Sequence, residues 1–156
     1  MGASGQASPA LLAVLLDEPF FRKPPPKSTG RDLFHSGWLD ARLASFPSLS
    51  PADVQATLLQ LTTTSISAAI LKEAAAAEDI FICGGGACNT ALMNALRASL
   101  TPRKVEATDA LGVSARHVEA LAFAWLARET LERRPANLPT VSGARGARVL
   151  GAVYPA

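Results

Sequence analysis

The sequence predicts an α/β protein that is mostly helical, with a small and incomplete parallel sheet. Alanine-rich runs and repeated helix start signals favour helix over most of the chain. Two short strand-like segments, the first of them uniformly apolar, alternate with helices, an order that predicts parallel strands covered by helices. Because most sheets have more strands than two, we expect the chain to be the end of a domain whose beginning lies elsewhere.

The first part of the chain predicts two short helices and a loop. Ser8 and Pro9 form an N-cap and a first helical residue, which predict a helix from Pro9 to about Glu18 that Pro19 helps to end. Three consecutive prolines then predict a polyproline-like loop, because proline cannot donate a backbone hydrogen bond. A second short helix is expected over residues 37–46, closed by Pro47.

A long helix is predicted from the start signal Ser50-Pro51, which is followed by an acidic residue in the first turn. This helix can extend to Ala76. Few charged residues interrupt its apolar positions, so we expect it to be largely buried.

The second half alternates strands and helices. Residues 80–83 are too short and too apolar for an amphipathic helix and predict a parallel strand buried on both faces. After three glycines, Asn89 can cap a helix over Thr90–Leu100. A brief strand is expected at Lys104–Ala107.

A further long helix is predicted over residues 114–134, and the chain beyond Pro135 is expected to be irregular. The helix carries one apolar stripe, which is made of Val118, Leu121, Ala122, Trp125 and Leu126.

Composition excludes several classes of function. Charged residues make up 18% of the chain, the formal net charge is +2, and no stripe of Lys and Arg marks a nucleic-acid face. No apolar run reaches the roughly 18–20 residues that a bilayer needs, so neither export nor a membrane span is expected. Cys83 and Cys88 have the spacing of neither a zinc knuckle nor a disulfide framework. We expect packed thiols in a reduced cytosolic protein.

The segment 79–96, DIFICGGGACNTALMNAL, is the candidate site. A strand that ends in glycines and leads into a helix offers free backbone N–H groups beside the positive end of a helix dipole, which suits a phosphate or a nucleotide. A Cβ atom would block that approach. The pattern is neither G-x-G-x-x-G nor a P-loop with Lys-Ser/Thr. A tight turn after a strand is the alternative.

Four stretches together resemble the C-terminal part of anhydro-N-acetylmuramic acid kinase, a family of the actin, hexokinase and chaperone ATPase superfamily. They are FICGGGACNTALMNALR, PPPKSTGRDLF, TDALGVSARHVEALAFAWLA and NLPTVSGARGARVLGAVYP. The resemblance extends from about Leu11 to Pro155. It implies the C-terminal portion of an actin-like ATPase lobe of the ribonuclease H-like kind.

The resemblance also implies site residues. Gly84, Gly85 and Gly86 would pass against the nucleotide, while Asn89 shapes the start of the helix. Glu119 would belong to the sugar-binding side, where a carboxylate can accept hydrogen bonds from sugar donors. The alternative for Glu119 is an ordinary solvated helix residue.

Other polar residues are weaker candidates. The segment KSTGR offers Lys27, Thr29 and Arg31 to an anion in the substrate cleft that the resemblance implies. The alternative is a turn with a helix cap. Asp109 can contribute to the same region, or can simply cap its turn. At Arg116 and His117 the sequence is more basic than family members often are at these positions. We expect His117 to be a surface residue.

The activity implied by the resemblance is hydrolytic phosphorylation of 1,6-anhydro-N-acetylmuramic acid to N-acetylmuramic acid 6-phosphate, with ATP and Mg²⁺, in cytoplasmic peptidoglycan recycling. The aspartate base and the phosphate-gripping loop belong to segments that would precede Met1, so no catalytic residue is expected here. Residues 1–156 are then one truncated lobe that needs the N-terminal lobe and further antiparallel strands.

This truncation predicts that the isolated chain has no kinase turnover, and that its uncovered edges and faces associate or aggregate. The family tends to form homodimers. Two other classes of function stay open: a non-catalytic nucleotide-binding module, and a structural helical domain that complements a partner.

Overall fold

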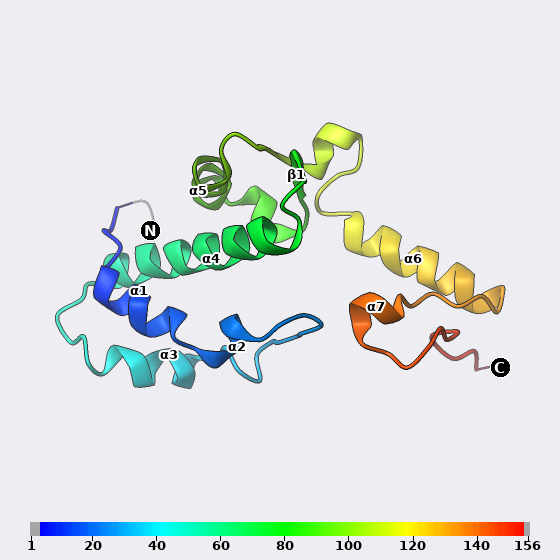
Figure 1. The fold of residues 1–156 in the computed structure, drawn as a ribbon, viewed down its shortest axis with the longest axis horizontal. Coiled ribbons are helices and arrows are strands. Elements are labelled where there is room, and N and C mark those ends of the chain that lie inside the picture. Colours follow the sequence, from blue (N-terminus) through cyan, green and yellow to red (C-terminus); the bar gives the residue numbers. More distant parts are fainter. Residues whose placement is uncertain (1–3, 155–156) are drawn as a thin grey trace.

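The computed structural model describes residues 4–154 and is mostly helical (Figure 1). Residues 1–3 and Pro155, at the end of the last family-like stretch, lie outside the described part. The elements follow in the order α1 (Pro9–Leu16), α2 (Pro19–Arg22), α3 (Ser36–Leu43), α4 (Pro51–Glu73), β1 (Asp79–Ile82), η1 (Gly85–Cys88), α5 (Thr90–Leu100), β2 (Lys104–Ala107), η2 (Thr108–Leu111), α6 (Val118–Leu131) and α7 (Pro139–Ser142).

The sheet consists of β1 and β2, which pair in parallel with Asp79 opposite Lys104 and Ile82 opposite Ala107. Helix α5 connects the two strands and packs against α4. The buried residues of this core are Ile80, Leu92, Met93, Leu96, Leu100 and Val105. The predicted small α/β arrangement is therefore confirmed.

A second core joins the first helices to α4. Leu11 and Leu15 of α1 are fully buried against Trp38 of α3 and Leu61 of α4. Partly buried residues of α4 contact both cores, among them Leu58 on one side and Ile66 on the other. Helix α4 thus holds the helical N-terminal part and the sheet together.

Helix α4 is less buried than predicted. Only 28% of its most apolar 18-residue window is buried, and Leu71 is 44% exposed. Among the described residues, α4 is the one helix long and apolar enough to cross a membrane, by length and composition alone. Because both cores form on α4, we interpret it as the central helix of this fold.

Several predicted boundaries match the structure, and others differ for local reasons. Helix α5 and strand β2 have the predicted bounds. Helix α1 stops at Leu16, and Pro19 starts α2 as its first residue. Helix α4 stops at Glu73, because the chain turns there and the Arg103 guanidinium binds the carbonyls of residues 75 and 77 at 2.8 and 3.0 Å.

The C-terminal segment lies to one side of the two cores (Figure 1). Helix α6 leads away from the sheet, and α7 and the tail run beside it. The predicted irregular tail is interrupted by α7, whose C-cap Gly143 has a left-handed φ of 71°.

Candidate nucleotide-binding turn

Gly84 follows β1 and has a backbone conformation that only glycine adopts readily. Its φ is 76° and its ψ is −170°, a region from which a Cβ atom excludes other residues. Its N–H donates to the carbonyl of Ala115 at 2.8 Å. The turn is thereby fixed to the segment that leads into α6.

Gly85 and Gly86 are not required by the packing of the chain itself. A Cβ atom on Gly85 would meet no atom within 4 Å, and one on Gly86 would meet only Leu92 Cδ2, at an ordinary contact distance of 3.6 Å. Gly85 is exposed. The space beside this backbone is therefore open to a flat or anionic group from solution.

Asn89 starts α5, as predicted. Its Oδ1 accepts a hydrogen bond from the Leu92 N–H at 3.1 Å, the geometry of an N-cap, and its own N–H donates to the carbonyl of Gly86 at 3.0 Å. The Asn89 side chain remains exposed. It therefore fixes the helix start that directly follows the glycines.

The two cysteines are exposed, so the prediction of packed thiols is wrong. Cys83 follows Ile82, the last residue of β1, and Cys88 is the last residue of η1. Interaction with the Cys88 side chain raises the pKa of the Arg116 guanidinium. Arg116, which the sequence marks only as unusually basic, therefore lies beside the glycine turn.

Asp109 has a structural contact at the same place. Its Oδ2 accepts from the Ala115 N–H at 3.1 Å, while the Ala115 carbonyl binds Gly84. Ala115 thus links the η2 turn to the glycine turn. This contact favours the structural explanation of Asp109 over a direct ligand role.

Glu119 lies in the first turn of α6 and is exposed, as is His117 before it. Because α6 begins three residues after Ala115, the start of the helix is anchored to the glycine turn. The exposed position of His117 confirms its prediction as a surface residue.

Lys27 is engaged elsewhere. Its ammonium donates to the carbonyls of Phe20 and Phe21 at 3.0 and 3.1 Å and lies 4.9 Å from the centre of the Phe20 ring. Thr29 and Arg31 are exposed. The structure ties Lys27 to α2 and does not join these three residues into one cluster.

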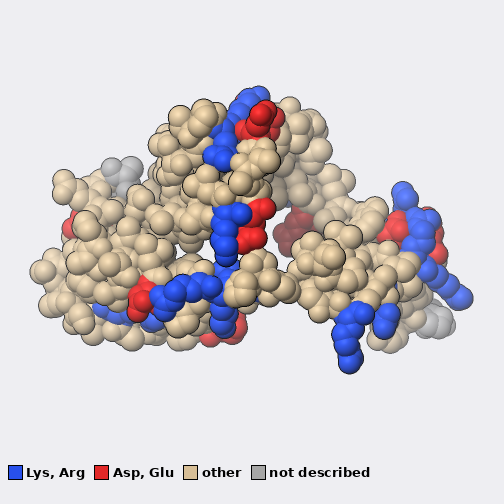
Figure 2. Space-filling model, in the orientation of Figure 1, with Lys and Arg blue, Asp and Glu red and all other residues tan. Residues whose placement is uncertain are grey.

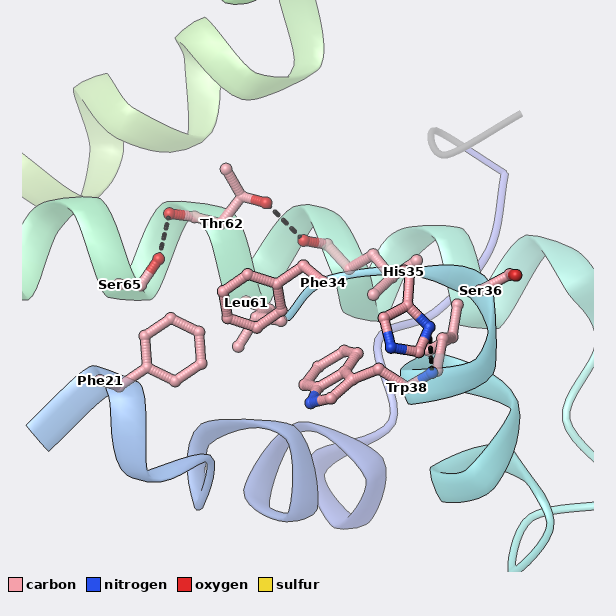
Figure 3. Close-up of a pocket in the computed structure, with 10 residues that line it drawn as sticks. Phe21, Phe34, His35, Ser36, Trp38, Leu61, Thr62 and Ser65 are labelled. Carbon is pink, nitrogen blue, oxygen red and sulfur yellow. Dashed lines mark hydrogen bonds between the residues drawn. The ribbon is translucent and has the colours of Figure 1, made fainter. Parts of the chain in front are cut away.

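An apolar pocket of about 410 Å³ lies between α2, α3 and α4 (Figure 3). Phe21, Phe34, Trp38 and Leu61 line it, and His35 stands at one end, where its Nδ1 accepts from the Trp38 N–H. No sequence pattern predicted this pocket. The signal was the four aromatic residues between positions 20 and 38.

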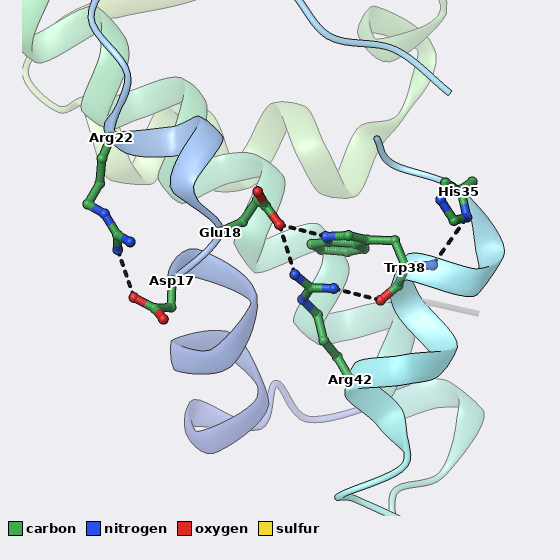
Figure 4. A network of polar contacts seen from close by, with 6 residues as sticks. All are labelled: Asp17, Glu18, Arg22, His35, Trp38 and Arg42. Atoms are coloured by element: carbon green, nitrogen blue, oxygen red, sulfur yellow. Dashed lines mark hydrogen bonds and ion pairs between the residues drawn. The ribbon is translucent and has the colours of Figure 1, made fainter. Parts of the chain in front are cut away.

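A polar network closes the same region from the other side (Figure 4). Glu18 Oε2 accepts from the Trp38 indole at 2.9 Å and from Arg42 at 2.8 Å, and the Arg42 guanidinium lies 4.1 Å from the Trp38 ring centre. These bonds fasten the start of α2 to α3. Their role is structural.

Potential metal ligands are dispersed. Over residues 4–154, no group of three or more His, Cys, Asp or Glu side chains is placed to hold a metal ion.

A family model described as anhydro-N-acetylmuramic acid kinase matches residues 1–156, which places the chain in a class of kinases. The chain belongs to the anhydro-N-acetylmuramic acid kinase family.

Curated relatives with that name come from several bacteria. The chain is 55% identical to one from Burkholderia orbicola (strain AU 1054), 54% to one from Cupriavidus pinatubonensis and 51% to one from Paraburkholderia xenovorans. Each alignment covers 98% of this chain but only 41% or 42% of the relative. The chain thus spans about two fifths of the length of the curated relatives it matches.

Proposed function

We propose that this chain supplies the nucleotide- and sugar-binding C-terminal part of a kinase that converts 1,6-anhydro-N-acetylmuramic acid to N-acetylmuramic acid 6-phosphate with ATP. The family match over residues 1–156 carries this proposal. The reaction belongs to peptidoglycan recycling in the cytoplasm, and Mg²⁺ would accompany the ATP phosphates. The fold would be part of an actin-like ATPase lobe of the ribonuclease H-like kind.

The glycine turn is the proposed nucleotide site. Gly85 and Gly86 leave open space that their own chain does not need, so the adenosine part of ATP can lie against their backbone. Gly84 and Asn89 hold the turn in place on either side. Arg116, beside Cys88, adds a positive charge that attracts an anionic nucleotide.

Glu119 is the proposed sugar ligand. It is exposed on the first turn of a helix whose start is anchored to the glycine turn, and its carboxylate can accept hydrogen bonds from hydroxyl or amide donors. No residue of this chain is proposed as the catalytic base. Phosphoryl transfer needs charge stabilisation from both walls of a closed cleft, and this chain offers one wall.

The test is reconstitution. The chain would be co-expressed with the part of the Burkholderia orbicola relative that it does not match, and ATP-dependent formation of the sugar 6-phosphate would be measured. We expect turnover from the pair and none from this chain alone. Turnover by the isolated chain would contradict the proposal that the catalytic base lies in the unmatched part. ATP binding by a well-formed but inactive pair would favour a non-catalytic nucleotide module.

A further inference from the structure

Helix α6 has the sequence of a buried helix but is exposed in the structure. Between Val118 and Ala127 the only charged residue is Glu119, and a helix that is apolar on all sides is normally covered by protein. Yet Leu121 is 55% exposed and Trp125 is 48% exposed, and Glu129 is the one buried residue of the helix. The apolar sequence of α6 therefore favours a partner surface over solvent as its environment.

The exposed apolar side chains lie on two different faces. Leu121 and Trp125 are four residues apart and share one face. Phe123 lies about 200° around the helix from Leu121 and borders a groove of about 650 Å³ between α6 and the tail. Glu119 is four residues before Phe123, so the proposed sugar ligand lies on that second face.

The surface over α6 and α7 is mostly free of charge at its centre (Figure 2). Charged side chains gather instead at the end of α6, where the Arg134 guanidinium binds Glu129 at 2.6 and 2.7 Å. Because interface cores are depleted in charged residues and interface rims are polar, this distribution of charge fits a protein interface.

We propose that the Leu121–Trp125 face of α6 is the docking surface for the part of the kinase that the curated relatives possess and this chain does not match. This inference rests on the proposed function. The unmatched part is well over half of each relative, which is enough chain to form a further domain. Docking on this face leaves the face of Glu119 free to line the cleft.

A second copy of this chain fits less well. A symmetric contact between two copies would bring the same patch of each together and cover one face of α6. Such a dimer would leave the open edges of the sheet of β1 and β2 uncovered. The unmatched part can do more, because the family resemblance implies that it contributes further strands.

The experiment uses this chain and the unmatched part of the Burkholderia orbicola relative as two separately tagged chains, and measures their binding. Leu121→Asp and Trp125→Asp place a charge at the proposed interface. Val14→Asp and Leu71→Asp are matched controls, because these residues are 43% and 44% exposed on α1 and α4. We expect the α6 variants to weaken binding at least about tenfold and the controls to leave it unchanged.

Circular dichroism and thermal unfolding of each free variant test its fold. A Leu121→Asp chain that folds as the wild type does but no longer binds supports the docking surface. Equal binding by all variants, no binding by the wild type, or a homodimer that depends on Leu121 would each overturn it. Binding that is lost in the α6 variants, in a pair without kinase turnover, would uphold the docking surface and refute the proposed function.

Discussion

Gly84 and Gly85 are neighbours, but only Gly84 has a backbone conformation that requires glycine. Gly84→Ala should lower the free energy of unfolding by about 1–3 kcal/mol, because its φ and ψ are unfavourable for a residue with a Cβ atom. Gly85→Ala should leave stability unchanged or raise it by up to about 1 kcal/mol. Urea unfolding of both variants measures the difference; equal losses would show that the turn needs both glycines for folding.

The ion pair of Glu129 with Arg134 should stabilise the folded chain at neutral pH and lose this effect in acid. The Arg134 guanidinium binds its carboxylate in a bidentate manner and lowers the pKa of Glu129. The unfolded chain, with the ordinary pKa of about 4.3, therefore binds a proton more readily than the folded chain. The contribution is fully present above about pH 4.3 and is lost as the pH falls through the lower pKa of the folded state.

Glu129→Gln should accordingly lower stability at neutral pH and reduce the loss of stability on acidification. Urea unfolding followed from about pH 7 to about pH 3 measures both effects. A variant that loses as much stability in acid as the wild type would show that another carboxylate is responsible. Asp53 is the comparison, because the Gln6 N–H and Ser50 also lower its pKa.

The residue types at the site could be predicted from sequence, but their environments could not. Asn89 is predictable as the N-cap of α5 because it stands between the glycine run and the apolar helix, where the helix has to begin. The exposure of Cys83 and Cys88 depends on tertiary packing, and local sequence carries no signal for that. The Arg116 contact with Cys88 joins residues that are far apart in the chain.

Two ion pairs flank α2: Glu18–Arg42 joins its start to α3, and Asp17–Arg22 joins the end of α1 to α2 (Figure 4). Glu18 and Arg42 have side chains only 11% and 24% exposed, whereas Asp17 and Arg22 are 80% and 62% exposed. Glu18→Gln weakens the bonds to both Trp38 and Arg42 and should cost about 1–3 kcal/mol. Asp17→Asn should cost no more than about 1 kcal/mol. Similar costs in thermal unfolding would contradict a fastening role for Glu18.

Local signals predicted the elements well where start and stop residues were strong. Ser50-Pro51 marks the start of α4, and Ser50 does cap it. The alanine run after Glu73 favours helix intrinsically, but a tertiary contact with Arg103 holds a turn there instead. Long-range contacts of this kind override propensity and have no local signature.

The burial of α4 and α6 was the least predictable feature, because it depends on what else covers them. Both helices are apolar enough for a core, yet Leu71 and Trp125 are about half exposed. The chain covers about two fifths of its relatives, and the remaining part can cover the Leu121–Trp125 face of α6. The sequence pattern of α6 is therefore that of a covered helix and differs from its exposed environment in this chain.

The central claim, that the open backbone at Gly85 receives ATP, is tested most directly by the ATP dissociation constant of the reconstituted two-chain protein. Gly85→Leu should weaken ATP binding at least about tenfold, because its side chain would fill the space that the nucleotide needs. Circular dichroism serves as the control for folding, since a Cβ atom at this position meets no atom of the chain. An unchanged ATP dissociation constant in a folded Gly85→Leu protein would contradict the account.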